Sequence, residues 1–198
     1  MNNVIKFENW KPEVYRIPIA NYAKVVEDAI LYEKFGIYIS YGEGIHAYHG
    51  SATIDRDLCK ELGVRVVDLN YHGGTILGSA ADLSIIIIFP TGMDLTHEVI
   101  INKIAEIIGE YVPGITVDGN DILVNGDKIS GSMMREVLRS TEWAAQITFG
   151  DYSEYIAKIC NKPPVKKPTF IDSNLLTRDK LEEEIVSWLQ STNETTEE

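Results

Sequence analysis

The chain has 198 residues, of which 44% are hydrophobic, and a formal net charge of −12. These values are ordinary for one soluble domain with a sizeable core, and the acidic excess disfavours nucleic acid and anionic membranes as partners. Two cysteines, Cys59 and Cys160, make no disulfide framework, and the sequence shows neither a signal peptide nor a run of ~18 apolar residues. We therefore expect a cytoplasmic protein without a membrane partner.

The first third of the chain predicts both helices and strands. Gly36 is placed to end an amphipathic helix, and the Gly42-Glu43-Gly44 turn separates two β-branched and aromatic runs, as in a hairpin. The expected elements are a lead-in with a short edge strand through residue 19, a helix over 21–35, a hairpin of strands 37–41 and 45–48, and a short helix over 54–62 capped by Thr53.

The stretch from Leu62 to Pro90 is the most informative part of the sequence. Gly63 ends a helix, a β-branched strand follows, and a turn with the paired glycines Gly73 and Gly74 leads into a strand with four consecutive isoleucines. A strand that is apolar on both faces belongs in the middle of a sheet. Paired glycines allow positive φ and leave room for a ligand against the main chain, or they form a plain hairpin turn without chemistry.

The rest of the chain continues the mixed pattern. Asn125-Gly126 between alternating strands is a strong hairpin signal, and the proline-rich, basic run from Lys162 to Pro168 is typical of a linker. The expected elements are a helix over 95–112, strands at 115–117, 121–124 and 128–129, a brief helix or a strand over 133–139, a strand over 144–149, a helix over 152–160, a helix from Thr177 to 190, and a disordered tail over 191–198. Together they predict an α+β fold of mixed, largely antiparallel sheets with packed helices.

The glycine stretch resembles the signature of the biotin/lipoate protein ligase family, Arg-Arg-x-Ser-Gly-Gly-Gly-x-Val-x-His-Asp-x-x-Asn-Leu. Gly73 and Gly74 match the last two glycines of that signature, and Asp82-Leu83 takes the place of Asn-Leu. The charged positions differ. The two arginines are Asp68 and Leu69 here, the serine and first glycine are Tyr71 and His72, and the His-Asp pair is Gly78-Ser79.

A second run, Asn120-Asp121-Ile122-Leu123-Val124-Asn125-Gly126-Asp127-Lys128-Ile129-Ser130-Gly131-Ser132, is similar to the family's Asn-Asp-Ile-x-Val-x-Gly-x-Lys-Ile-Ser-Gly-Ser. The family lysine bridges the carboxylate of the cofactor and the α-phosphate of its adenylate, a role that the resemblance gives to Lys128. It likewise places Asp121 near the nucleotide and its metal. A fixed cation between two anions stabilises the charge that develops at phosphorus.

The resemblance implies one ligase-like domain over residues 1–171, with residues 172–190 as its closing helix. The implied function is a lipoate- or biotin-type cofactor–protein ligase or acyltransferase, an enzyme that uses ATP and Mg²⁺ to activate lipoate, octanoate or biotin. The acyl group would pass from its adenylate to a lysine of a lipoyl- or biotinyl-carrier domain. The implied nucleotide-binding residues are Asn120, Asp121 and Lys128, with Lys128 catalytic and Asp121 also the metal ligand. The implied acid-binding residues are His72, Gly73, Gly74, Thr75, Ile76, Gly78, Ser79, Asp82, Ser130 and Gly131.

Three alternatives remain open at this point. Loss of the arginines and of the His-Asp pair favours a catalytically degenerate relative that serves as a ligand- or protein-binding module. His46, His49 and His72 could suggest a metal site, although residues three apart on a strand face opposite ways. Cys160 could be an acyl-transfer nucleophile, but its place in an apolar helix is more typical of packing.

Overall fold

The computed structural model describes residues 6–49, 54–68, 75–160 and 164–191, and shows a mixed α+β fold with two sheets. The large sheet has the strand order β1-β2-β6-β10-β9-β8-β7, and only its β1–β2 pair is parallel. Its strands are β1 (Glu13–Pro18), β2 (Gly36–Tyr41), β6 (Leu83–Pro90), β10 (Ser140–Ile147), β9 (Asp127–Val137), β8 (Asp121–Val124) and β7 (Ile115–Asp118). The predicted fold class is confirmed.

The small sheet has the order β4-β3-β5, with β3 parallel to β4 and antiparallel to β5. Its strands are β3 (His46–His49), β4 (Arg65–Asp68) and β5 (Thr75–Gly78). The helices are α1 (Tyr22–Leu31), α2 (Arg56–Glu61), α3 (His97–Gly109), α4 (Ser153–Ile159) and α5 (Arg178–Ser191), with 3-10 turns at Phe7–Asn9 and Ile19–Asn21. No helix in the described ranges is long and apolar enough to cross a membrane.

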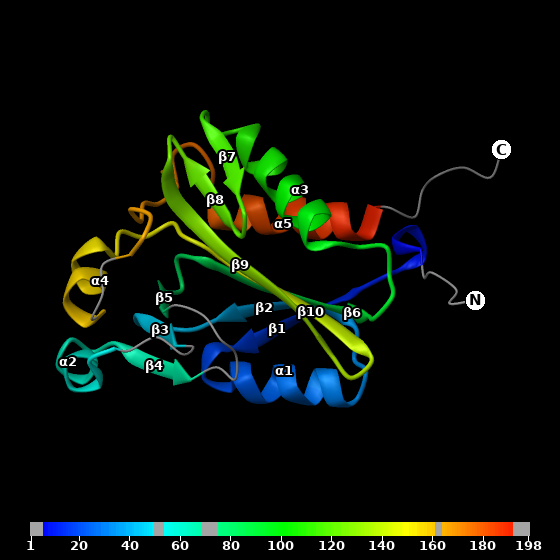
Figure 1. The fold of residues 1–198 in the computed structure, drawn as a ribbon, viewed down its shortest axis with the longest axis horizontal. Coiled ribbons are helices and arrows are strands. Elements are labelled where there is room, and N and C mark those ends of the chain that lie inside the picture. The colour runs from blue at the N-terminus through cyan, green and yellow to red at the C-terminus, as the bar shows by residue number, and fades with distance from the viewer. Residues whose placement is uncertain (1–5, 50–53, 69–74, 161–163, 192–198) are drawn as a thin grey trace.

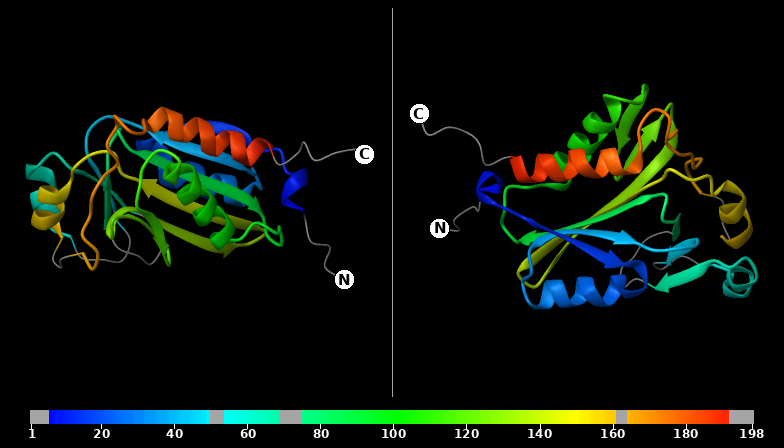
Figure 2. Two further views of the ribbon diagram at one scale, coloured as in Figure 1. Left: turned by 90° about the horizontal axis from the view of Figure 1, so that it is seen from above. Right: turned by 180° about the vertical axis from the view of Figure 1, so that it is seen from behind.

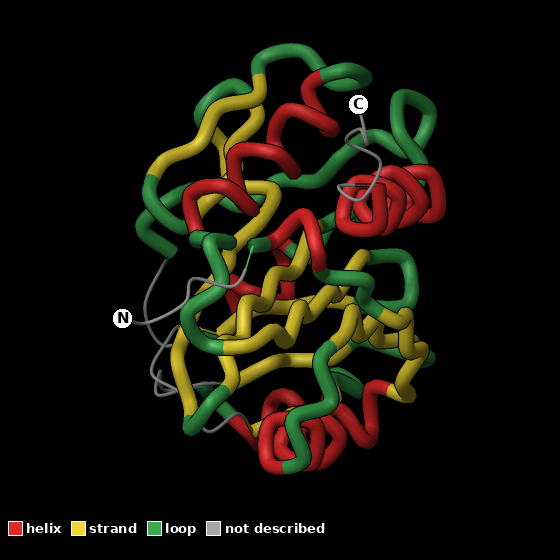
Figure 3. Tube along the Cα trace, turned by 90° about the vertical axis from the view of Figure 1, so that its right-hand side faces the viewer, coloured by secondary structure: helices red, strands yellow, loops and turns green. Residues whose placement is uncertain are grey.

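The helices cover the large sheet on both faces. Figure 1 shows α3 and α5 on one face and α1 on the other, while α2, α4 and the small sheet gather at one end. The two further views in Figure 2 agree with this arrangement, and Figure 3 shows the strands between the helices. Both faces of the large sheet are therefore covered near its centre.

Strand β6 explains why the core has two halves. Ile85 and Ile87 pack into the cluster under α3 and α5, whereas Ile86 and Ile88 pack into the cluster under α1. All four are fully buried, and burial of each contributes about 1.5–3 kcal/mol relative to exposure. The central position predicted for this strand is confirmed by its neighbours β2 and β10.

Two predicted strand pairings are wrong. Strands β2 and β3, expected as a hairpin, belong to different sheets, because β2 is buried between β1 and β6 and the chain then crosses to the small sheet. Strands β4 and β5 do not pair as a plain hairpin across the paired glycines either, because β3 lies between them. Tertiary contacts set the partners of these strands, and local turn signals do not.

Most other elements match the prediction, with shifted ends. Helix α1 ends at Leu31 instead of residue 35, and Glu33 follows with φ of 51°. Asp55 caps α2, while the predicted cap Thr53 lies outside the described residues. Thr96 caps α3, the three-strand meander β7-β8-β9 is confirmed, and residues 133–137 continue β9 as a strand.

A close contact between Gly78 and Gln146 joins the small sheet to the large one. Gly78 ends β5, and a Cβ at this position would lie 2.9 Å from Cδ of Gln146 in β10 and closer still to its Nε2. Such a separation is shorter than atoms in proteins tolerate. Glycine at position 78 therefore lets the backbone of β5 rest directly on the side chain of Gln146.

The buried carboxylate of Asp82 makes a second joint between the sheets. Its Oδ1 accepts hydrogen bonds from the backbone of Phe149 (2.6 Å) and Gly150 (3.1 Å), and its Oδ2 accepts from the backbone of Ser79 (2.7 Å) and the hydroxyl of Tyr152. Burial raises the pKa of Asp82, although all four hydrogen bonds oppose the shift. The turn after β5 is thus tied to the segment that links β10 to α4.

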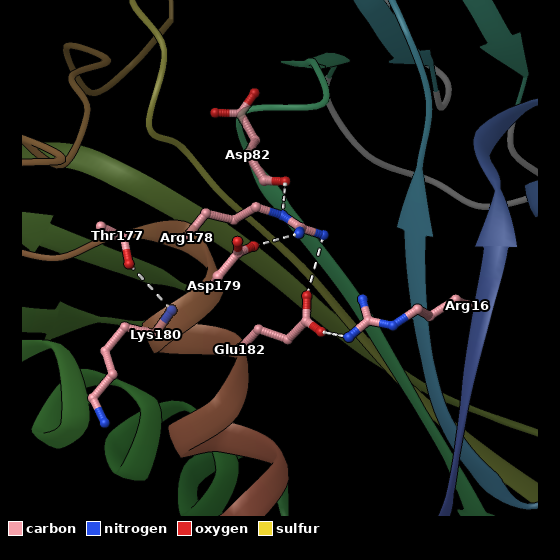
Figure 4. A network of polar contacts seen from close by, with 7 residues as sticks. All are labelled: Arg16, Asp82, Thr177, Arg178, Asp179, Lys180 and Glu182. Atoms are coloured by element: carbon pink, nitrogen blue, oxygen red, sulfur yellow. Dashed lines mark hydrogen bonds and ion pairs between the residues drawn. The ribbon is translucent and has the colours of Figure 1, made fainter.

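Helix α5 reaches the same joint through its first residue. Arg178 donates from Nε to the backbone oxygen of Asp82 (3.3 Å) and pairs through Nη2 with Glu182 (3.2 Å). Glu182 in turn binds Arg16 of β1. Figure 4 shows this relay from Asp82 through Arg178 and Glu182 to Arg16. The buried Glu182 is therefore held between two arginines from different elements.

Replacement of Gly78 by alanine should destabilise the protein by about 1–3 kcal/mol, because the new methyl group overlaps Gln146. In a Gln146→Ala background the same change should cost clearly less, which chemical denaturation of all four proteins in a double-mutant cycle would measure. Gly109→Ala is the control, since a Cβ there meets nothing nearer than 3.9 Å. Equal costs in both backgrounds would show that the Gly78–Gln146 contact is not the constraint.

Replacement of Asp82 by alanine should lower the free energy of unfolding by about 3 kcal/mol or more, because four donors lose their acceptor. Tyr152→Phe should cost about 1 kcal/mol, since it removes one of the four. The matched control is Asp151→Ala, whose exposed carboxylate accepts a hydrogen bond from the backbone of Ser153. A loss no larger than that of the control, measured by urea unfolding, contradicts the role of Asp82 as a joint.

Candidate functional site

A β-bulge in β9 determines where the side chain of Lys128 lies. Leu123 pairs with Lys128 and Ile122 pairs with Ser130, so Ile129 is one extra residue in β9. In an unbroken strand, Lys128 and Gly131 would face opposite ways because they are three residues apart. The extra residue brings both to one face, and a Cβ at Gly131 would lie 3.0 Å from Nζ of Lys128. The lysine thus lies over a residue that has no side chain.

The ammonium group of Lys128 is held by Asp121 of β8. Its Nζ lies 2.7 Å from Oδ1 of Asp121, and Nζ of Lys166 lies 2.8 Å from Oδ2 of the same carboxylate. Burial alone raises the pKa of Asp121, but hydrogen bonds and charges from Lys128 and Lys166 outweigh it and hold that pKa below its usual value. Two cations therefore share one largely buried carboxylate.

The proline-lysine segment brings Lys166 to this position. The backbone N–H of Lys128 donates to the oxygen of Lys167 (2.8 Å), and the backbone N–H of Thr169 donates to the oxygen of Lys128 (2.8 Å). Lys166 also pairs with Asp118 (2.9 Å), and the hydrogen bonds that Lys166 donates to Asp121 and Asp118 raise its pKa. The part of this segment from residue 164 onward is docked on the β7-β8-β9 meander, so the linker prediction is wrong there.

A row of small and polar side chains continues from this ion pair across the large sheet. The strand registers place five residues side by side on the face that carries α1 and the small sheet: Asp121, Gly131, Gln146, Ser84 and Ser40. We call these five residues the polar row. The next row on the same face is apolar, and consists of Met133, Ala144, Ile86 and Tyr38.

The small sheet presents Gly78 and Ile76 to the polar row. Leu77 packs with α2 and α4 in the core of the small sheet, so its neighbours Ile76 and Gly78 point the other way. Gly78 contacts Gln146, one strand away from Gly131 and Lys128. Lys128 and the last residue of β5 therefore lie over two neighbouring residues of the polar row, Gly131 and Gln146.

The structure distributes the other residues predicted for the site among several environments. The Ser130 side chain faces the core under α3 and α5, since Ser130 pairs with Ile122 and Ile147, and it is 2% exposed. Ser79 and Asp82 belong to the joint between the sheets. Asn120 lies in the turn before β8, where its backbone oxygen accepts from Ser132. His72, Gly73 and Gly74 lie outside the described residues, and Thr75 is described as backbone in β5.

The contacts of Asp121 do not suit the Mg²⁺ ion predicted for it. Magnesium takes oxygen ligands in octahedral geometry, and both carboxylate oxygens of Asp121 already face ammonium groups at 2.7 and 2.8 Å. No group of three or more His, Cys, Asp or Glu side chains that could hold a metal is found in the described part of the chain. His46 is buried, its Nδ1 lies 3.1 Å from the backbone oxygen of Gly44, and burial lowers its pKa.

Two residues of this region escape the sequence reasoning. Lys166 lies in a segment whose composition suggests a linker, and Gln146 lies in a strand where only its apolar neighbours carry a signal. The amide oxygen of Gln146 is buried without a hydrogen-bond partner among the described residues. Such a group costs about 1–3 kcal/mol.

A large groove lies elsewhere on the molecule. It runs between β1 and α5, measures about 1530 Å³, and is bordered by Arg16, Glu182 and Val186 among others. None of the residues predicted for the site borders it. The groove is therefore separate from the part of the polar row that Lys128 and Gly78 contact.

Comparison with known proteins gives matches of structure and none of sequence. No protein-family model matches the chain, and no curated protein does. The bi-partite lipoate protein ligase of Thermoplasma acidophilum, studied with its E2 lipoyl domain, superposes with a TM-score of 0.72 at 13% identity, over 93% of this chain and 84% of that one.

A lipoate-protein ligase A bound with ATP gives a TM-score of 0.70 at 14% identity, over 92% and 85% of the two chains. A biotin protein ligase variant from Aquifex aeolicus in complex with biotin gives 0.54 at 10% identity, over 91% and 69%. At these identities the likeness concerns the fold. The chain has the fold of a biotin/lipoate ligase-like catalytic domain, as its two sequence motifs predict.

Proposed function

We propose that this protein is a lipoate- or biotin-type cofactor–protein ligase. It activates a carboxylic acid such as lipoate, octanoate or biotin with ATP, and transfers the acyl group to a lysine of a lipoyl- or biotinyl-carrier domain. The observation that carries this proposal is the placement of the Lys128 amine over Gly131, on the face of the large sheet that Gly78 contacts. A fixed cation beside a residue without a side chain attracts a carboxylate head group and leaves room for it.

In the proposed reaction, a carboxylate oxygen of the acid attacks the α-phosphorus of ATP, and pyrophosphate leaves. The amine of the carrier lysine then attacks the acyl carbon, and AMP leaves. Lys128 binds the carboxylate and stabilises the negative charge that develops on the phosphoryl oxygens. Lys166 supplies a second positive charge through Asp121. No step assigned to these residues passes through a metal ion.

The second candidate is a degenerate relative that binds a ligand or a protein without adenylation. Asp68, which stands where the ligase signature has an arginine, forms an ion pair with Arg56 of α2 and is 63% exposed. The carboxylate of Asp68 therefore makes a surface ion pair and supplies no positive charge at this position. Loss of a phosphate-binding arginine costs several kcal/mol of transition-state stabilisation in enzymes of this kind.

Replacement of Lys128 by methionine should abolish acid-dependent exchange of labelled pyrophosphate into ATP, by about 100-fold or more, because methionine keeps the length and removes the charge. The matched control is Lys167→Met, since Lys167 is exposed and pairs with Asp127 outside the polar row. Exchange that survives Lys128→Met overturns the assignment of Lys128. Wild-type protein that binds an acid tightly but catalyses no exchange supports the degenerate relative.

Replacement of Asp121 by asparagine should destabilise the protein at pH 7 and progressively less towards acid. The lysines hold the pKa of Asp121 below its usual value, so its stabilisation is present above the unfolded-state pKa of about 3.9 and disappears as pH falls through the folded-state value. Urea unfolding between pH 7 and pH 3 would measure this, with the exposed Asp57→Asn as control. If the difference in unfolding free energy between the wild type and Asp121→Asn does not change with pH, the ion pairs of Asp121 with Lys128 and Lys166 do not stabilise the protein as expected.

A further inference from the structure

Two buried side chains near Lys128, Ser130 and Gln146, each have an oxygen without a hydrogen-bond partner among the described residues, and of these two only Gln146 lies on the face that carries the polar row. Gln146 lies in the middle of the polar row, between Gly131 of β9 and Ser84 of β6, and is 5% exposed. Its outer side is covered by the backbone of Gly78. Its Oε1 has no hydrogen-bond partner within the described ranges of the chain.

Stability alone does not account for an amide at this position. Buried polar groups in folded proteins are almost always hydrogen-bonded, and an orphan group is a cost that an apolar residue of similar size avoids. The next residue on the same face of β10 is Ala144, and the apolar row beside it packs well. A leucine would fit this environment by its chemistry. The retained amide therefore points to a role in binding.

The position of Gln146 shows which ligand group it can reach. Gln146 and Gly131 are directly paired in the antiparallel ladder, so their Cα atoms are roughly 5 Å apart. The Lys128 amine lies over Gly131 and therefore beside the base of Gln146. A carboxylate bound by this ammonium group lies within reach of the neighbouring amide, whose Nε2 can donate a hydrogen bond to it, since an ionised carboxylate only accepts.

We propose that Gln146 is a substrate-binding residue that hydrogen-bonds the carboxyl head group of the acid held by Lys128. This inference rests on the proposed function and adds to it a neutral, directional contact beside the lysine charge. Lys128 supplies attraction to the anion, and the planar amide fixes its orientation. The ligand class is a carboxylic acid whose head group lies over Gly131, beside Lys128 and the amide of Gln146.

The test uses the change Gln146→Leu, because it should move stability and affinity in opposite directions. Without ligand, the variant should unfold at a higher urea concentration than the wild type, since the orphan amide is gone. Its affinity for whichever of lipoate, octanoate or biotin the wild type binds should fall by about tenfold, as measured by isothermal titration calorimetry. Gln146→Glu should weaken binding further, because its carboxylate repels that of the ligand.

The control Gln190→Leu makes the same chemical change far from Lys128. Gln190 donates to the backbone oxygen of Pro12, so this variant should lose stability and keep its affinity for the acid. Unchanged affinity in Gln146→Leu, with binding lost in Lys128→Met, overturns the role of Gln146 and leaves the proposed function intact. A less stable Gln146→Leu with weaker binding shows a merely structural residue and also overturns it. Wild-type protein that binds none of the three acids overturns both proposals.

Discussion

One extra residue in β9 is the constraint on which the arrangement around Lys128 depends. Without the bulge at Ile129, the alternation of the strand would put Lys128 and Gly131 on opposite faces. With it, Ile129 and Ser130 both point to the core under α3 and α5, and the lysine crosses to the face that carries the small sheet. The bulge interrupts the regular hydrogen-bond ladder between β8 and β9, and it thereby determines on which face the charge of Lys128 lies.

The charge so placed is already neutralised inside the protein. Asp121 holds Lys128 and Lys166 together, and its own desolvation is more than offset because two cations share it. An anionic ligand must therefore compete with Asp121 for Lys128, while Lys166 keeps Asp121 satisfied. Because Asp118 also pairs with Lys166, the two ammonium groups and two carboxylates of this cluster carry no net charge, and Lys128 becomes a free cation only when Asp121 pairs with Lys166 alone.

The sequence predicts where helices and strands occur better than it predicts which strands pair with one another. Asn125-Gly126 fixes a local turn, so β7, β8 and β9 are found from the sequence, and the four isoleucines of β6 mark the centre of the sheet. The β2–β3 hairpin fails because strand partners are chosen by packing over long range. Lys128 and Gly131 are three residues apart in one motif, yet they share a face of the sheet, and the motif carries no sign of this when the bulge is unknown. Lys166 is hidden for a related reason, since composition describes the proline-rich run and does not reveal its docking on Lys128.

The way in which this chain departs from the ligase signature follows a consistent physical logic. Two arginines are absent from their usual positions, and an aspartate that pairs with Arg56 stands in one of them. Lys128 stands at the family's own lysine position and does not take the place of an arginine. An ammonium group is also a point charge, whereas a guanidinium group binds a carboxylate with two parallel hydrogen bonds. Under the proposed function, Lys128 would therefore attract the head group without fixing its orientation. A planar amide, fixed by the contact with Gly78 and adjacent to the lysine, is the group in the polar row that can supply direction. Under the two proposals made above, the unfavourable burial of Gln146 and the absence of the arginines have one explanation, which is that a neutral amide orients the head group.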